Sequence, residues 1–293
     1  MDSKAINHES SRARWQAYRR RPLSLLLRLA VTVSAAITVF VLIALVAYIL
    51  IKGIPNLRPS LFAWEYTSEN ASMLPAIINT ITMTVLSLLM AVPVGICSAI
   101  YLVEYAKRGN KLVSLVRITA ETLQGIPSIV YGLFGFLFLV VACKFGYSLL
   151  SGAITLAIMI LPLILRTTEE ALKAVPDLYR EGSFGLGAGR LRTVFRIVLP
   201  SAVPGILAGV ILAIGRIVGE TAALIYTSGT VAGVPDTLMG SGRTLAVHMY
   251  ALLSNGLYTE EAYATAVVLL VMVIGINALS GWLAKKVSAK QGE

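Results

Sequence analysis

Long apolar stretches separated by polar segments dominate the chain, and six of them are long enough to cross a membrane as helices. A spanning helix needs about 20 mainly apolar residues, because every backbone polar group must be satisfied within the segment. No stretch shows the alternation that is typical of a strand. The sequence therefore predicts an all-α integral membrane protein with six transmembrane helices. The predicted spans are residues 25–51, 73–102, 122–143, 149–165, 202–224 and 262–283.

The first apolar stretch follows an arginine-rich polar tail, so a cleavable signal peptide is an alternative interpretation of this region. Its apolar run is about twice as long as the usual signal-peptide core of about 7–15 residues. We therefore expect an uncleaved transmembrane helix at 23–52, preceded by a tail at 1–22.

Composition narrows the class of protein further. Hydrophobic residues make up 57% of the chain and charged residues 14%, against about 45–50% and about 25% in soluble domains. These values exclude a disordered chain, a collagen-like chain and a soluble enzyme. Cys97 and Cys143 lie in apolar stretches without the spacing of a metal site or a disulfide framework. We interpret both as buried apolar side chains and expect no metal.

The formal net charge of +10 arises from 25 Lys and Arg residues against 15 Asp and Glu residues. If the N-terminus is cytoplasmic, 20 of these 25 basic residues lie on cytoplasmic segments, 4 lie outside, and Arg216 lies within the fifth span. This bias places both termini in the cytoplasm. Because the charge is spread over short segments that flank the membrane, we expect the lipid bilayer, and no nucleic acid, as its partner.

The polar segment at 166–200 carries a specific spacing of acidic, small and apolar residues. A glutamate is followed by two small residues, then after three residues by a glycine, and after nine more by I-x-L-P. This pattern resembles the EAA loop of ABC importer permeases and predicts a short helix that docks into a partner ATPase. An interfacial turn that merely connects two spans is the alternative. The anchors are Glu181, Gly182, Ser183, Gly187, Ile197, Leu199 and Pro200.

No segment of the chain has the pattern of a nucleotide-binding or hydrolytic site. The glycine-rich run at 185–189 lacks the third glycine of G-x-G-x-x-G, and no lysine with a following Ser or Thr completes a P-loop. We therefore expect no cofactor and no catalytic residue in this chain, with ATP and Mg²⁺ bound by a partner ATPase. A membrane-embedded enzyme is disfavoured because HExxH, paired carboxylates and a Ser/His/Asp cluster are missing.

The fifth predicted span contains two charged residues, Arg216 and Glu220, at i and i+4. This spacing puts them on one helix face, close enough to pair. A charge at membrane depth costs about 2.5–3.5 kcal/mol on insertion scales, so it is a functional candidate by default. Arginine suits a tetrahedral oxyanion, because its planar fork makes two parallel hydrogen bonds. The alternative is an ion pair that only locks the helix bundle.

The start of the third span contains Gly125 and Pro127, which weaken a regular helix. Broken helices at membrane depth present free backbone N–H groups that suit an anion. We therefore include Gln124 and Ser128 among the candidate translocation-path residues. A Pro-kinked helix with a packing role only is the alternative.

Four segments resemble one branch of the ABC permeases, the phosphate-specific importers. These are G-R-I-V-G-E-T-A-A at 215–223, Q-G-I-P-S-I-V-Y-G-L-F at 124–134, R-T-T-E-E-A-L-x-x-V-P at 166–176 and R-E-G-S-F-G-L-G-A at 180–188. The last two are similar to the A-type member.

The resemblance implies a MetI-like type I importer permease fold in the inner membrane of a prokaryote, with the N-terminus inside. Its core would cover 70–285, with the coupling loop at 166–200, an external loop at 226–261 and a cytoplasmic tail at 286–293. It also implies that phosphate passes Arg216, Glu220, Thr221, Gln124 and Ser128.

The function that the resemblance implies is ATP-driven import of inorganic phosphate by a heteromeric complex. The implied partners are a homologous C-type permease, an ATPase dimer and an extracytoplasmic phosphate-binding protein. The binding protein would dock on the external loop, which carries Asp236, Arg243, Glu260 and Glu261. We interpret His248, in the same loop, as a solvated loop residue. Alternatives are a permease for phosphonate, sulfate or molybdate, and an autonomous channel or proton-coupled carrier, which would need no coupling motif.

Overall fold

The computed structural model describes residues 22–107 and 109–289. Most of the predicted tail at 1–22, and residues 290–293 of the C-terminal tail, lie outside the described residues. The chain divides into two compact units, Met1–Ile51 and Lys52–Glu293. We describe each unit by itself.

The first unit consists, in its described part, of the long helix α2 (Pro22–Gly53), whose last two residues belong to the second unit. It has 32 residues, which at 1.5 Å per residue is about 48 Å. None of its most apolar window is buried within the chain. A helix that is apolar all round is typical of a membrane span.

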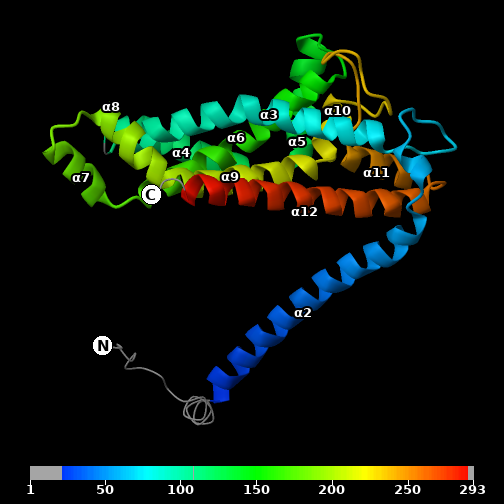
Figure 1. Cartoon of the computed structure of the whole chain (residues 1–293), viewed down its shortest axis with the longest axis horizontal. Coiled ribbons are helices and arrows are strands. Elements are labelled where there is room, and N and C mark those ends of the chain that lie inside the picture. Colours follow the sequence, from blue (N-terminus) through cyan, green and yellow to red (C-terminus); the bar gives the residue numbers. More distant parts are fainter. Residues whose placement is uncertain (1–21, 108, 290–293) are drawn as a thin grey trace. The chain divides into compact units, whose positions relative to one another are not determined.

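The second unit is a bundle of long helices that run alongside one another (Figure 1). The long helices are α3 (Leu74–Ile100), α6 (Leu149–Lys173), α9 (Leu199–Val218) and α12 (Thr259–Ala289). Helix α6 is the central one, because 67% of its most apolar window is buried and it packs against both α3 and α9. The described residues contain no strand.

Shorter elements connect and cap the long helices. The α-helices are α4 (Lys111–Gln124), α5 (Ser128–Gly135), α7 (Asp177–Gly185), α8 (Arg190–Thr193), α10 (Ala222–Thr227) and α11 (Leu245–Ser254). Two 3₁₀ turns, Ile54–Asn56 and Pro59–Phe62, follow α2. Three π-helical segments, Tyr101–Tyr105, Phe136–Ala142 and Val194–Val198, adjoin α3, α5 and α9.

Small and hydroxylated residues bring the central helices together. A β-carbon at Gly95 of α3 would lie 2.7 Å from Ile164 Cγ2 of α6, and one at Gly209 of α9 would overlap Thr167 of α6. The Ser87 hydroxyl of α3 donates to the Ala153 carbonyl of α6 at 3.1 Å. Interhelical hydrogen bonds and close backbone approach are the interactions that associate helices where water is excluded.

The structure has five or six candidate spans against the six predicted, and two of the predicted spans differ at their ends. Five single helices are long and apolar enough to cross a membrane, and the sixth candidate is a bent pair, Lys111–Gln124 and Ser128–Ala142, with an angle of 102° between its halves. The predicted third span at 122–143 is therefore too long at its start. The predicted fifth span at 202–224 is not one helix, because α9 ends at Val218.

The two cysteines and His248 do not lie where the sequence predicted. Cys97 and Cys143 are both exposed, so they are not part of the buried core. His248 is not a solvated loop residue, because it lies on α11 and is fully buried. The apolar run that contains His248, Leu245–Ser254, is too short to count as a span, so hydrophobic length alone does not identify this helix.

Candidate functional site

Two interrupted helices lie next to each other in the second unit. The first interruption separates α4 from α5 at 125–127, and the second separates α9 from α10 at 219–221. Behind them α5 and α10 are in close contact, since a β-carbon at Gly132 would lie 2.8 Å from the Ala223 α-carbon. Glycine at this position allows that approach. Interrupted helices leave backbone groups outside the regular ladder, as in the ion and substrate sites of many transporters.

Arg216 lies in the last turn of α9 and is half-buried, whereas Glu220 follows the end of that helix and is 9% exposed. The Glu220 carboxylate accepts a hydrogen bond from the backbone N–H of Ala223 at 3.1 Å, so it caps α10. Among the described residues, no ion pair joins Arg216 to Glu220 or to any other carboxylate. The expectation that the two pair on one helix face is therefore wrong.

The Arg216 guanidinium lies within electrostatic range of Tyr131, a buried residue of α5. The Tyr131 hydroxyl donates to the Leu123 carbonyl at 2.8 Å and so bridges the α4–α5 interruption. The sequence analysis missed Tyr131, because a tyrosine in an apolar span gives no signal of its own. The result is an uncompensated cation beside an interrupted helix.

The remaining candidate path residues flank the same two interruptions. Gln124, the last residue of α4, donates from Nε2 to the Pro162 carbonyl of α6 at 3.0 Å. Ser128 is the first residue of α5 and is half-buried. Thr221 precedes α10 and is also half-buried. These residues stand around the interruptions together with Arg216, but their role in transport is a proposal.

The predicted coupling segment forms α7 and α8 at one end of the bundle, with α10 and α11 at the opposite end (Figure 1). Glu181 and Gly182 are exposed, and Leu178 and Leu186 beside them are 76% and 91% exposed. Apolar side chains that are this exposed, around an acidic residue on a short helix, form a surface suited to a protein partner.

The turn between α7 and α8 depends on one glycine. Gly187 has φ +81°, a left-handed conformation that residues with a β-carbon rarely adopt. Its N–H donates to the Phe184 carbonyl at 2.9 Å. The Ser183 hydroxyl is buried and lies 2.8 Å from the Thr193 hydroxyl of α8, which fixes the angle between the two short helices.

The last three anchors of the motif connect α8 to the bundle. Ile197 is half-buried in the π-helical segment, and Leu199 and Pro200 begin α9. Proline is favoured in the first turn of a helix, where its missing N–H is not needed. The segment from α8 to α9 therefore runs without a flexible joint from the exposed helices into the bundle.

Arg180 fastens α7 to the bundle and was missed by the sequence analysis. Its Nη2 lies 2.7 Å from Glu104 Oε1, in the π-helical segment that follows α3, and 2.9 Å from the Leu172 carbonyl of α6. Its Nη1 donates to the Val175 carbonyl at 2.8 Å and to Asp177 Oδ1 at 3.1 Å. Arg180 lies 76 residues from Glu104 along the chain, so no local pattern could reveal the contact.

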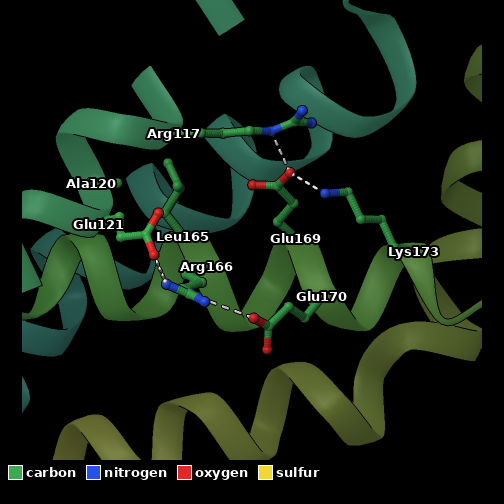
Figure 2. A pocket seen from close by; sticks show the side chains of 8 residues that line it. All are labelled: Arg117, Ala120, Glu121, Leu165, Arg166, Glu169, Glu170 and Lys173. Atoms are coloured by element: carbon green, nitrogen blue, oxygen red, sulfur yellow. Dashed lines mark hydrogen bonds and ion pairs between the residues drawn. The ribbon is translucent and has the colours of Figure 1, made fainter. Parts of the chain in front are cut away.

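A second ion-pair network joins α4 to α6 around a cavity of about 200 Å³ (Figure 2). The buried Glu169 carboxylate lies 2.6 Å from both Arg117 Nε and Lys173 Nζ. Arg166 lies 3.4 Å from Glu121 and 3.1 Å from Glu170. Three cations balance three carboxylates here, so the network ties helices together and leaves no surplus charge for an anion.

The described residues contain no group of three or more His, Cys, Asp or Glu side chains that could hold a metal ion. The candidate site therefore rests on Arg216 and the interrupted helices, with α7 and α8 as its connection to a partner.

The chain is similar to known transport proteins. Residues 91–291 match the family "Binding-protein-dependent transport system inner membrane component". The chain is 32% identical to the "Probable ABC transporter permease protein YqgI" of Bacillus subtilis, over 87% of this chain and 93% of that protein. It is 31% identical to the "Phosphate transport system permease protein PstA 2" of Mycobacterium bovis, over 92% of this chain and 91% of that protein.

A solved structure has a similar fold. It is a bacterial ABC transporter involved in the import of the acidic polysaccharide alginate, with a TM-score of 0.60 and 18% identity. The similarity covers 93% of this chain and 98% of that one.

Proposed function

Because the chain belongs to the family of binding-protein-dependent transport system inner membrane components, we propose that it is the A-type permease subunit of an ATP-driven importer of inorganic phosphate. The family, the relatives and the fold make it a membrane permease subunit of an ABC importer. Phosphate as the substrate is supported by the relatives named phosphate transport permeases, at 31–35% identity over most of the chain.

One observation carries the proposal at the level of the site. Arg216 is a half-buried cation without a carboxylate partner among the described residues, and it stands where two helices are interrupted. A guanidinium binds a tetrahedral oxyanion through two parallel charge-assisted hydrogen bonds. Gln124, Ser128 and Thr221 supply neutral donors at the same interruptions. Neutral donors orient the ion without binding it too tightly for release.

The chain works within a complex. A homologous C-type permease completes the translocation path, and an extracytoplasmic phosphate-binding protein delivers the ion to the external loop at 226–261. A dimeric ATPase binds Mg²⁺ and ATP and hydrolyses the ATP, so this chain is a non-catalytic subunit. The exposed residues Leu178, Glu181 and Leu186 contact that ATPase. The N-terminus then lies in the cytoplasm of a prokaryote.

The test is ATP-dependent uptake of labelled phosphate by proteoliposomes that contain the whole complex and the binding protein. Arg216→Gln lowers the uptake rate at least tenfold, and Arg216→Lys gives an intermediate rate because it keeps the charge but loses the fork. Lys144→Gln, which removes an exposed cation, is the matched control. Normal uptake by an assembled Arg216→Gln complex would show that Arg216 is not on the path.

Two rivals are separated by the same preparation. A permease for phosphonate, sulfate or molybdate takes up that labelled anion in preference to phosphate. An autonomous channel or proton-coupled carrier transports without the ATPase subunits. Uptake that requires both ATP and the ATPase, and that excess sulfate does not inhibit, supports the phosphate importer.

A further inference from the structure

Helix α11 lies at the end of the bundle opposite α7 (Figure 1), and buried polar side chains gather at its start. The central residue of this group, Arg243, comes just before α11 and is 6% exposed. The Arg243 backbone is fixed on both sides, since its N–H donates to the Val231 carbonyl at 2.9 Å and its carbonyl accepts from Asn79 Nδ2 at 3.2 Å. The position of this arginine is therefore set by the fold.

The Arg243 side chain is charged, buried and uncompensated. Its Nε and Nη2 have no hydrogen-bond partner, and no carboxylate within the described ranges pairs with it. The guanidinium carbon lies 4.6 Å from the centre of the Tyr66 ring. A cation–π contact offsets only part of the cost of burying an unpaired charge. A ligand of opposite charge would restore the balance.

His248 shares this environment and supplies a neutral hydrogen-bond donor. It is fully buried, its ring meets Tyr66 edge-on at 6.1 Å, and neither of its nitrogens has a well-formed hydrogen bond. Burial, and to a smaller extent the charge of Arg243, lower the pKa of His248 to about 3, which the Ala71 backbone offsets only in part. The ring is therefore uncharged at neutral pH and carries one N–H.

Both residues belong to the start of the same helix. Thr244 separates Arg243 from α11, and its carbonyl accepts the backbone N–H of His248 at 2.8 Å. The first turn of a helix adds a partial positive charge, which favours an anion. The cluster thus combines a fixed cation, a neutral N–H donor and a helix start, and it contains no carboxylate.

We propose that Arg243 and His248 form a second oxyanion site, which receives phosphate at the external end of the bundle before it reaches Arg216. The inference rests on the proposed function, because that function places the α7 end in the cytoplasm and the Arg243 end outside. Phosphate bound here compensates the charge of Arg243 and accepts a hydrogen bond from the His248 ring. The site is a waystation between the binding protein and the interrupted helices.

The decisive experiment supplies the missing carboxylate from the protein itself. Thr244→Asp places a negative charge next to Arg243 at the N-cap of α11, where aspartate is favoured. If Arg243 has only a structural role, an internal counter-ion stabilises the protein and leaves transport intact. If Arg243 receives phosphate, the carboxylate occupies the site. We expect the KM for phosphate to rise at least tenfold while the melting temperature of the complex stays the same or rises.

Two controls separate charge from shape and from general electrostatics. Thr244→Asn has nearly the same shape as Thr244→Asp without its charge, and its KM stays within twofold of the wild-type value. Arg58→Gln removes an arginine of the external segments that is 64% exposed and lies 3.8 Å from Glu260, and it leaves KM unchanged. All variants are measured in proteoliposomes with the complete complex and the binding protein.

If Thr244→Asp fails to assemble, variants of Arg243 test the second site. Arg243→Gln then raises the KM for phosphate more than tenfold, and Arg243→Lys raises it less. Normal KM values for Thr244→Asp, or for Arg243→Gln, overturn the second site. If the wild-type complex transports sulfate and not phosphate, the proposed function fails. The second site is then tested separately with sulfate, by whether Thr244→Asp has a higher KM than Thr244→Asn.

Discussion

Arg180 of α7 and Glu104, in the π-helical segment that continues α3, form an ion pair in which Arg180 Nη2 lies 2.7 Å and Nε 3.2 Å from the same carboxylate oxygen. Both side chains are largely buried, at 14% and 9% exposed. Because planar pairs of this kind resist bending, a displacement of α7 is passed directly to α3. We therefore expect α7, the helix proposed to contact the ATPase, and α3 to move together.

Breaking this pair uncouples ATP hydrolysis from transport. For Arg180→Gln and for Glu104→Gln we expect the number of ATP molecules hydrolysed per phosphate to rise several-fold, because α7 moves without α3. The measurement is parallel ATPase and uptake assays on the same proteoliposomes. Asp177→Asn is the control, since Asp177 is 77% exposed and its contact with Arg180 is worth less than about 1 kcal/mol. A normal ratio in Arg180→Gln contradicts this role.

Removing the buried carboxylate of the second network destabilises the chain. Glu169→Gln leaves Arg117 and Lys173 without their shared partner, and we expect a loss of about 1–3 kcal/mol, reduced from the fully buried case because both cations are half-exposed. Glu121→Gln, at a side chain 71% exposed, costs less than about 1 kcal/mol. Thermal unfolding in detergent gives both values, and equal melting temperatures for the two variants would refute the difference in burial.

A side chain at Gly187 strains the turn between α7 and α8. Gly187→Val places a β-branched residue at φ +81°, at a cost of about 1–3 kcal/mol, although nothing lies within 4 Å of the added carbon. The strain is local, so we expect weaker binding of the ATPase subunit, measured by co-purification, with little change in overall stability. Gly182→Ala is the contrasting variant, because it stabilises α7 by up to about 1 kcal/mol. Undiminished ATPase binding by Gly187→Val would mean that the turn is not part of the contact.

His248 makes the stability of the bundle depend on pH. Its folded pKa of about 3 lies below the unfolded value of 6.5, so folding holds it neutral. The stabilisation is complete above about pH 6.5 and decreases as the pH falls from 6.5 towards 3. Between pH 7 and pH 5 we expect a loss of about 2 kcal/mol. Melting temperatures at pH 7 and pH 5 measure this loss. We expect a smaller change in melting temperature between the two pH values for His248→Asn, and an equal change would show that other groups cause the pH dependence.

The sequence predicted the membrane helices and the helix interruption at Gly125 and Pro127, because hydrophobic length and backbone restriction are local properties. It did not predict the end of α9. Pairing of Arg216 with Glu220 at i,i+4 assumes an unbroken helix. In the structure α9 ends at Val218, and the Glu220 carboxylate instead accepts a hydrogen bond from the first turn of α10. A glycine at 219 was the available signal.

Contacts between distant segments could not be predicted from one sequence. Glu104 and Arg180 are brought together only when α3 and α7 pack, and Glu169 meets Arg117 only when α4 folds against α6. By contrast, the Glu169–Lys173 and Arg166–Glu170 pairs have the i,i+4 spacing by which a sequence indicates ion pairs within one helix. The burial of His248 needed α11, which hydrophobic length alone could not identify.

If Arg216 receives phosphate as proposed, its lack of a carboxylate partner among the described residues has an electrical consequence. An empty site holds one positive charge within the membrane field, and the same site with a phosphate dianion holds one negative charge, so loading reverses the sign of the force that the voltage exerts on it. Each elementary charge moved across 100 mV changes the free energy by about 2.3 kcal/mol. An interior-negative potential opposes inward movement of the site loaded with a dianion and favours inward movement of the empty site. With a bound monoanion the loaded site is electrically neutral, so the voltage exerts no net force on it. Membrane voltage therefore distinguishes between the two protonation states of the transported ion.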